Sequence, residues 1–89
     1  MDFSLSTEVA NKLKKIKQKH PLLFKKVQKQ LKTFKENIQH PSLRTHKLKG
    51  KLSNTWSISI ESNVRLIYTI KNNEAIFFKI GSHDEVYRN

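Results

Sequence analysis

The chemistry open to this sequence lies in its imidazole and guanidinium groups, above all His46, Arg65 and His83. Arg65 stands inside the otherwise apolar run 64–70, VRLIYTI. A guanidinium in such a strand must find a partner or face a cleft, because burying the charge alone is costly. Histidine, with an unperturbed pKa of about 6.5, suits general acid–base work near neutral pH. These side chains are therefore the candidates for a functional site.

Each of these groups also has an ordinary structural interpretation. Arg65 could form a salt bridge with Glu61 or lie at a strand end. His83 follows the last expected strand on a turn at 81–82, and loops held by a rigid sheet often carry catalytic groups. Considered singly, however, His46 and His83 would be surface histidines. The residues alone leave both interpretations open.

Several other kinds of site are excluded by what the sequence lacks. It has no cysteine, so it has no disulfide, thiolate metal site or cysteine nucleophile. Neither a glycine-rich phosphate loop nor a GxSxG elbow is present. The four histidines, at positions 20, 40, 46 and 83, lack the usual zinc-site spacing, and His20 and His40 precede prolines as turn or cap residues do. We expect no metal and no cofactor.

The charge of the chain is concentrated in one block. The 89 residues carry 18 Lys plus Arg against 7 Asp plus Glu, a formal net charge of +11. Residues 11–51 hold 14 of the basic residues and one acidic residue, Glu36. Such a block repels itself unless a polyanion relieves it, and solubility needs a net charge of only about 2–8. The charge therefore favours a partner that is a nucleic acid, an anionic membrane or an acidic protein. The alternative is that the charge only keeps a small protein soluble.

The first half of the sequence predicts a strand followed by a helical hairpin. Apolar residues alternate over 2–6, and Ser6 or Thr7 can cap the helix that follows. Apolar residues then recur at helical spacing on both sides of Pro21. Because proline disfavours helix in the residue before it and suits a first helical turn, two helices should meet there.

The second half predicts three strands. Residues 56–61, 64–70 and 75–80 are strand-like, with turns at 62–63 and 72–73. Trp56 and Tyr68 stand where core residues would, which favours packing over base stacking. The expected fold is α+β, a β-α-α-β-β-β layout with a small antiparallel sheet packed against a helical hairpin.

The chain should form one domain over 1–89, since domains typically run to about 100–150 residues. Its longest apolar runs are far too short to cross a membrane. Its start, MDFSLSTEV, lacks the basic and apolar regions of a secretory signal. We therefore expect a cytoplasmic protein.

Two segments taken together resemble the RelE/ParE superfamily of toxins from type II toxin–antitoxin systems. They are THKLKGKLSNTWSISIESNVRLIY (45–68) and FKIGSHDEVY (78–87). The pattern is a Leu-Lys-Gly before a hairpin, an alternating strand, an Arg-Leu-Ile-Tyr strand and a terminal Gly-x-His followed by an aromatic. It is most similar to the YafQ- and YoeB-like members, and their fold is the RelE-like layout expected above.

The resemblance implies a metal-independent, ribosome-dependent mRNA endoribonuclease that arrests translation. In such members a base activates the ribose 2′-OH for attack on the adjacent phosphate. His46 matches the position of that base, Arg65 the phosphate-binding arginine and His83 the general acid. Tyr87 matches an aromatic residue that orients the scissile nucleotide.

The sequence departs from RelE at two strand positions. Ser57 and Ser59 stand where RelE has lysines, and a histidine, His83, replaces an arginine after the last strand. Asn63 and Val64 stand where YafQ-like members have an aspartate and a tryptophan. The site therefore resembles a mixture of the family's patterns.

The resemblance also implies partners: mRNA, the ribosome and an acidic cognate antitoxin, with the toxin alone a monomer. We expect the basic block to bind ribosomal RNA through lysines on the helices and beside the first hairpin: Lys12, Lys15, Lys25, Lys26, Lys29, Lys47, Lys49 and Lys51. Two alternatives remain at this point. One is a ParE-like DNA gyrase inhibitor, and the other is a basic RNA-binding domain without catalysis.

Overall fold

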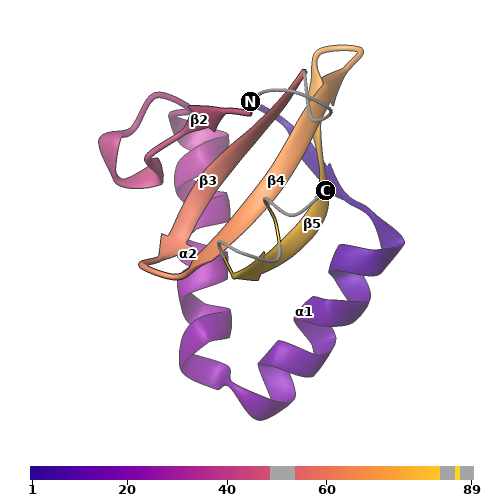
Figure 1. Cartoon of the computed structure of the whole chain (residues 1–89), viewed down its shortest axis with the longest axis vertical. Helices are drawn as coiled ribbons and strands as arrows, with labels where there is room; N and C mark the ends of the chain where they lie inside the picture. The colour runs from indigo at the N-terminus through magenta and orange to yellow at the C-terminus, as the bar shows by residue number, and fades with distance from the viewer. Residues whose placement is uncertain (49–53, 83–85, 87–89) are drawn as a thin grey trace.

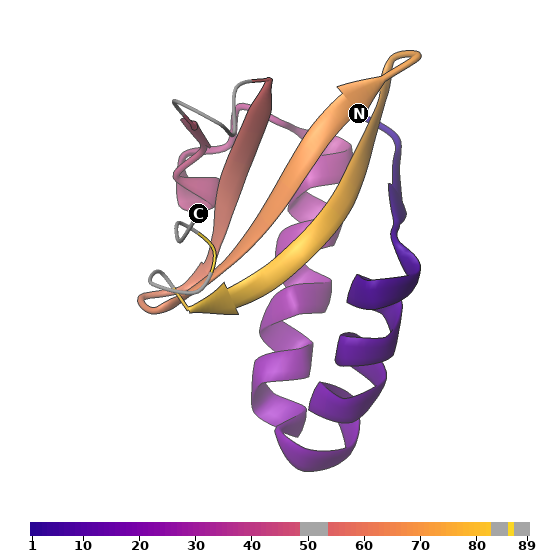
Figure 2. The same ribbon diagram turned by 45° about the vertical axis from the view of Figure 1, so that its right-hand side comes forward.

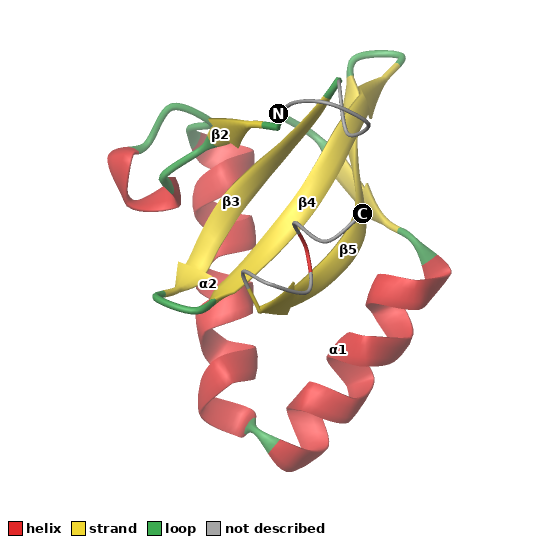
Figure 3. Ribbon diagram, in the orientation of Figure 1, coloured by secondary structure: helices red, strands yellow, loops and turns green. Residues whose placement is uncertain are grey.

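The fold is a five-stranded sheet with two helices on one face, as Figures 1 and 3 show. The computed structural model describes residues 1–48, 54–82 and 86. The elements, in chain order, are β1 (Phe3–Leu5), α1 (Thr7–Lys19), α2 (Pro21–Glu36), a 3-10 turn η1 (Pro41–Leu43), β2 (His46–Lys47), β3 (Thr55–Glu61), β4 (Val64–Lys71) and β5 (Glu74–Ser82).

The two helices begin and end where the sequence predicted. The Ser6 hydroxyl accepts a hydrogen bond from the Val9 amide, so it satisfies one of the unpaired donors at the start of α1. His20 ends α1, and Pro21 is the first residue of α2. His40 caps η1, because its Nδ1 accepts a hydrogen bond from the Ser42 amide. The expected turn and cap roles of these two histidines are confirmed.

The sheet confirms the α+β prediction and adds two features to it. The strand order is β1-β5-β4-β3-β2, and β1 pairs with β5 in parallel whereas the other pairs are antiparallel. The two-residue strand β2 was not predicted. The predicted turn at Gly81 and Ser82 is wrong, because β5 continues through both residues, opposite Arg65 and Val64. Hydrogen bonding to β4 keeps this glycine extended.

The predicted turn between β4 and β5 is confirmed by two asparagines. Asn72 and Asn73 have φ values of 52° and 62°. Two consecutive residues with positive φ make the type I′ turn that suits the twist of a two-residue hairpin, and asparagine tolerates that region.

The main core lies between the sheet and the helices, as the view in Figure 2 shows. Phe34 of α2 is fully buried, and its ring meets Phe77 and Tyr68 edge-on at 5.1 and 5.0 Å between centroids. Trp56 stacks on Tyr68 with centroids 5.7 Å apart. The prediction that these two aromatics pack as core residues is confirmed.

The opposite face of the sheet, called the outer face below, carries a second apolar cluster. Leu48, Ile67 and Val86 are buried together there, with Phe78 packed against them. A bulge in β5 adds Phe78 between the partners of Ile67 and Tyr68. The outer face is therefore partly covered, and its polar residues lie beside apolar ones.

One buried polar side chain joins the helices to the sheet and to η1. Gln30 of α2 is only 7% exposed, and its amide nitrogen donates to the carbonyls of Ser42 at 3.1 Å and Ser59 at 2.8 Å. No helix in the described part of the chain is both long and apolar enough to span a membrane.

Replacing Gln30 with alanine should lower the free energy of unfolding by about 2 kcal/mol, because two carbonyls lose their donor. The matched control is Gln28→Ala on the same helix, whose exposed side chain should change stability by less than about 0.5 kcal/mol. Urea unfolding followed by circular dichroism measures both. Equal losses in the two variants would contradict this role for Gln30.

Candidate functional site

Arg65 lies near the start of β4 with small residues on either side. The register pairs it with Ser59 of β3 and with Gly81 of β5. Its side chain is half-buried on the outer face, which it shares with Ile67 two residues along the strand. Because neither neighbour has a bulky side chain, the guanidinium has room beside it on the sheet.

Three hydrogen bonds hold the Arg65 guanidinium. Its Nε donates to the Ser57 hydroxyl at 2.9 Å, and its Nη2 donates to the carbonyl oxygens of Arg44 at 2.7 Å and Ser57 at 3.4 Å. A guanidinium has five N–H donors. Within the described residues, the two donors on Nη1 have no acceptor. They are thus available to an anion.

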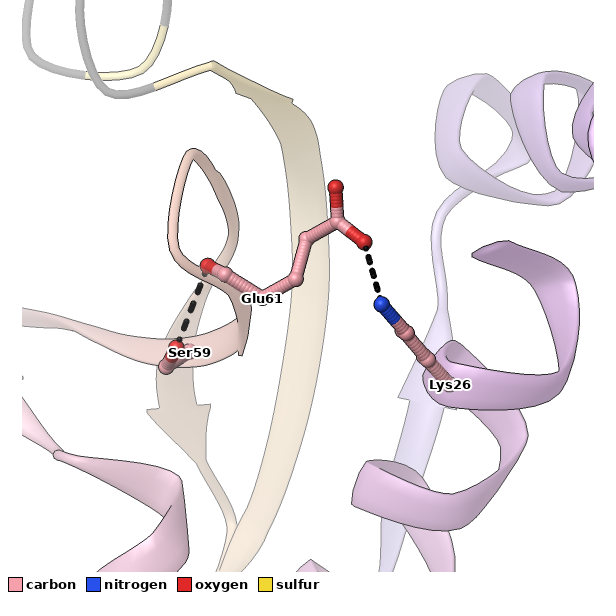
Figure 4. A network of polar contacts seen from close by, with 3 residues as sticks. All are labelled: Lys26, Ser59 and Glu61. Carbon is pink, nitrogen blue, oxygen red and sulfur yellow. Dashed lines mark hydrogen bonds and ion pairs between the residues drawn. The ribbon is translucent and has the colours of Figure 1, made fainter. Parts of the chain in front are cut away.

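The alternative that Arg65 forms a salt bridge with Glu61 is wrong. The Glu61 carboxylate pairs with Lys26 of α2, with 3.0 Å between Oε1 and Nζ (Figure 4). The same figure shows the Ser59 hydroxyl donating to the Glu61 backbone carbonyl. The acceptors of Arg65 are a hydroxyl and two carbonyls, all neutral, so its positive charge is not cancelled.

The Arg44 carbonyl is placed by a strained residue at the end of η1. Arg44 has a φ of 45°, in the left-handed region that costs a non-glycine residue about 1 kcal/mol. Its amide donates to the Pro41 carbonyl at 3.1 Å, and Gln30 holds the Ser42 carbonyl within the same turn. A chain of hydrogen bonds therefore runs from α2 through η1 to Arg65.

His46 lies on the same face as Arg65. It pairs with Ser57, so both residues point to the outer face, and its side chain is exposed. His46 lies two strand spacings from Ile67, and Arg65 is two residues farther along β4, so the Cα atoms of His46 and Arg65 are about 12 Å apart. His46 belongs to the edge strand β2, which the sequence did not predict. Edge pairing with β3 gives it a set position beside Ser57.

Lys79 is a cation on the outer face that the sequence analysis missed. It pairs with Ile67 beside the β5 bulge and is half-buried. The signal that singled out Arg65 could have found it, since Lys79 is the one charged residue in the apolar run AIFFKI (75–80). Arg65 and Lys79, with His46 on the same face, give this part of the outer face a basic character.

Four of the predicted site residues lie outside the described residues: Lys49, Lys51, His83 and Tyr87. The described part of β5 ends at Ser82, opposite Val64 and directly before His83 in the sequence. No group of three or more potential metal ligands occurs among the residues that the structure describes.

The predicted lysines of the helices lie on the other side of the sheet from Arg65. Figure 2 shows both helices on the face opposite the outer face. All five of these lysines are exposed, namely Lys12, Lys15, Lys25, Lys26 and Lys29. Lys47 also lies on the helix side of the sheet, since its Nζ is 5.8 Å from the centroid of the Trp56 ring, which packs against the main core. The structure thus separates the lysines from the arginine and histidine.

Replacing Ser57 with alanine should loosen the Arg65 guanidinium without unfolding the chain. A hydrogen bond to a charged group contributes about 1.5 kcal/mol, so solvent exchange of the Arg65 Nε proton should speed up about tenfold. The measurement is exchange of the arginine Nε–H signals by NMR. Ser59→Ala is the control, because that hydroxyl donates to Glu61 and not to Arg65; an equal effect there would refute the assignment.

Comparison with known proteins gives the family. The model of the YafQ family, described as a bacterial toxin of type II toxin–antitoxin systems, matches residues 1–88. Curated protein sequences gave no match.

Three solved structures show the same fold. A YoeB/ParE toxin from Agrobacterium tumefaciens has a TM-score of 0.80 at 14% identity, over 93% of this chain and 99% of that chain. The YoeB–YefM toxin–antitoxin heterotetramer from Staphylococcus aureus has a TM-score of 0.77 at 24% identity, over 93% of this chain and 97% of that chain. The DinJ–YafQ complex from E. coli has a TM-score of 0.76 at 17% identity, over 97% of both chains. The resemblance to RelE/ParE toxins is confirmed, and because the family model spans almost the whole sequence, the chain belongs to the YafQ family of type II toxin–antitoxin toxins.

Proposed function

We propose that this toxin is a ribosome-dependent mRNA endoribonuclease. The observation that carries the proposal is the Arg65 guanidinium, which is held by neutral acceptors with the Nη1 donors available on the face that also bears His46. Phosphate accepts two parallel N–H donors from one guanidinium, and arginine provides them in a planar fork. The outer face therefore suits a phosphodiester with an imidazole nearby.

The reaction needs only groups of the chain and the substrate. His46 takes the proton of a ribose 2′-OH, and that oxygen attacks the adjacent phosphorus. The bond from phosphorus to the 5′-oxygen then breaks, and His83 gives this oxygen a proton. The products are a 2′,3′-cyclic phosphate and a free 5′-OH. Arg65 stabilises the extra negative charge on the pentavalent phosphorane, and no metal or cofactor takes part.

The register of β5 supports the assignment of His83. Gly81 pairs with Arg65 and Ser82 with Val64, so the strand brings the chain beside Arg65 directly before this histidine. In the proposal, Tyr87 orients the nucleotide at the cleaved bond by stacking or hydrogen bonding.

In this proposal the lysines of the helices bind ribosomal RNA. Cations on one layer and the reactive groups on the other would let the toxin lie between ribosomal RNA and mRNA. Binding through phosphate contacts releases counterions and depends on salt. This activity would take place in the cytoplasm.

An antitoxin partner fits the charge of the chain. E. coli YafQ is found in a complex with DinJ, and S. aureus YoeB with YefM. We propose that an acidic antitoxin covers the basic surface of this toxin, whose net charge is +11. Without that partner the toxin would be a monomer.

Replacing Arg65 with glutamine should reduce mRNA cleavage about a hundredfold or more, the scale expected when a donor to a developing oxyanion is lost. His83→Ala should lose about a hundredfold or more through the missing proton. The measurement is primer extension on mRNA in a translating extract. The matched control is Lys71→Gln, which removes one exposed cation from the far end of β4. Uncut mRNA with the wild-type protein would contradict the proposal, and inhibition of gyrase that survives Arg65→Gln would favour the ParE-like alternative.

Replacing Lys29 with glutamine should lower the salt dependence of ribosome binding. Loss of one phosphate contact reduces the slope of log affinity against log salt by about 0.7–0.9. Lys26→Gln, one turn away, should change the slope less, because the Lys26 ammonium already pairs with Glu61. Sedimentation with ribosomes at several salt concentrations measures the slopes. A wild-type affinity that barely changes with salt would argue against RNA docking by these lysines.

A further inference from the structure

A cavity of about 440 Å³ lies on the helix side of the sheet, between the segment 38–45 and strands β3 and β4. Its walls are largely apolar and aromatic. Ile38 and Pro41 line it from the segment after α2, Trp56 from β3, and Tyr68 and Ile70 from β4. Among the described residues around Arg65, only Arg44, whose carbonyl accepts a hydrogen bond from Arg65, also lines this cavity. Its volume is ample for a purine or pyrimidine ring.

We propose that this cavity receives the unstacked base of a nucleotide next to the scissile phosphate of the RNA. The inference rests on the proposed function and adds a second subsite to it. Single-stranded RNA is recognised through splayed bases that insert among aromatic side chains and bond along their polar edges. The cavity offers largely apolar walls for such a base.

Tyr68 supplies the first polar group. The residue is only 2% exposed and lines the cavity, yet within the described residues its hydroxyl has no hydrogen-bond partner. Burial raises the pKa of the Tyr68 phenol, so the group stays a donor at neutral pH. No buried side-chain polar atom in the described part of the chain lacks a partner, so the Tyr68 hydroxyl is accessible to solvent, and an acceptor on a base can take the place of water.

His40 supplies a second donor. It lines the cavity, and its Nδ1 accepts the hydrogen bond from the Ser42 amide. An imidazole that accepts at Nδ1 carries its proton on Nε2. Together with the Tyr68 hydroxyl, this N–H gives the cavity two donors for the acceptor atoms of a base.

Arg44 connects the cavity to the proposed cleavage site. Its side chain lines the cavity, while its carbonyl accepts the Nη2 bond of Arg65. The next residue, Thr45, also lines the cavity, and His46 then points to the outer face beside Ser57. The short segment 44–46 thus connects the two places, and an RNA strand that crosses it can reach both.

Charge favours an anionic occupant such as RNA over an apolar peptide. Arg44 at the cavity and Lys47 over the Trp56 ring are both cations, and the described residues that line the cavity include no acid. A phosphate between the two nucleotides would lie over the segment 44–46, within reach of the Arg44 guanidinium. A base in the cavity and a phosphate on Arg44 therefore form one continuous binding path to Arg65.

Trp56 is the one tryptophan of the chain, so its fluorescence reports directly on the cavity. The probes are adenosine, adenosine 5′-monophosphate and a 2′-O-methylated trinucleotide, which cannot be cleaved by 2′-OH attack. We expect a saturable change in emission with all three, and tighter binding of the monophosphate than of adenosine. No saturable change with any probe would overturn the proposal.

Two variants test the groups separately. Thr45→Phe fills the cavity from its exposed rim and should raise the dissociation constant of every probe at least about tenfold. Arg44→Gln should weaken the monophosphate about threefold to tenfold but leave adenosine unchanged. The control for the lost charge is Lys14→Gln, an exposed lysine on α1 away from the cavity. Circular dichroism confirms the fold of each variant.

The outcomes distinguish this inference from the proposed function. Binding of the probes that is unchanged in both cavity variants overturns the pocket, even where mRNA is cleaved. Binding that is lost in Thr45→Phe supports the pocket, even where wild-type protein leaves mRNA uncut. Emission that responds to an acidic peptide and not to the nucleotide probes assigns the cavity to a protein partner and overturns the proposal.

Discussion

The position of the Arg65 guanidinium is the constraint on which the outer face depends. A half-buried cation in a sheet needs acceptors, and a carboxylate would satisfy it at the cost of cancelling its charge. Here the Ser57 hydroxyl and backbone carbonyls accept instead, while Glu61 pairs with Lys26. The guanidinium is therefore oriented and still positive, which is the state in which it can attract an anion.

The position of Arg65 also depends on a residue of helix α2. Gln30 is a polar residue buried on the packed side of α2, where apolar residues would be expected. Its two hydrogen bonds connect α2 to the Ser42 carbonyl, two residues before Arg44, and to the Ser59 carbonyl of β3. The left-handed Arg44 then turns its carbonyl to Arg65. Backbone geometry set in this way holds a site more precisely than flexible side chains would.

The side chains of β2 alternate between the two faces of the sheet, and the two faces carry different proposed functions. His46 shares the outer face with Ser57, while Lys47 lies over Trp56 on the helix side. Successive residues of a strand point to opposite faces, so neighbours in sequence serve different surfaces. By the same rule, Thr45 lines the cavity, whereas the next residue, His46, lies on the outer face with Arg65.

The sequence by itself determined the elements that depend on near neighbours. Apolar spacing and Pro21 defined both helices, alternation defined the long strands, and Asn72–Asn73 marked their turn. Arg65 could be singled out because a charge in an apolar strand is costly wherever the strand lies, and the family pattern named His46. These signals are local, so they can be read along the chain.

Only the tertiary structure decided what joins distant segments. The parallel pairing of β1 with β5, the extension of β5 through Gly81 and Ser82, and the edge strand that carries His46 all depend on partners far away in the sequence. The acceptors of Arg65 come from Ser57 and Arg44, 8 and 21 residues away, and no local pattern specifies them. Hydrogen bonds between remote residues form only once packing has brought their backbones together. The neutral acceptors that leave Arg65 charged therefore follow from the tertiary structure and cannot be read from the order of residues.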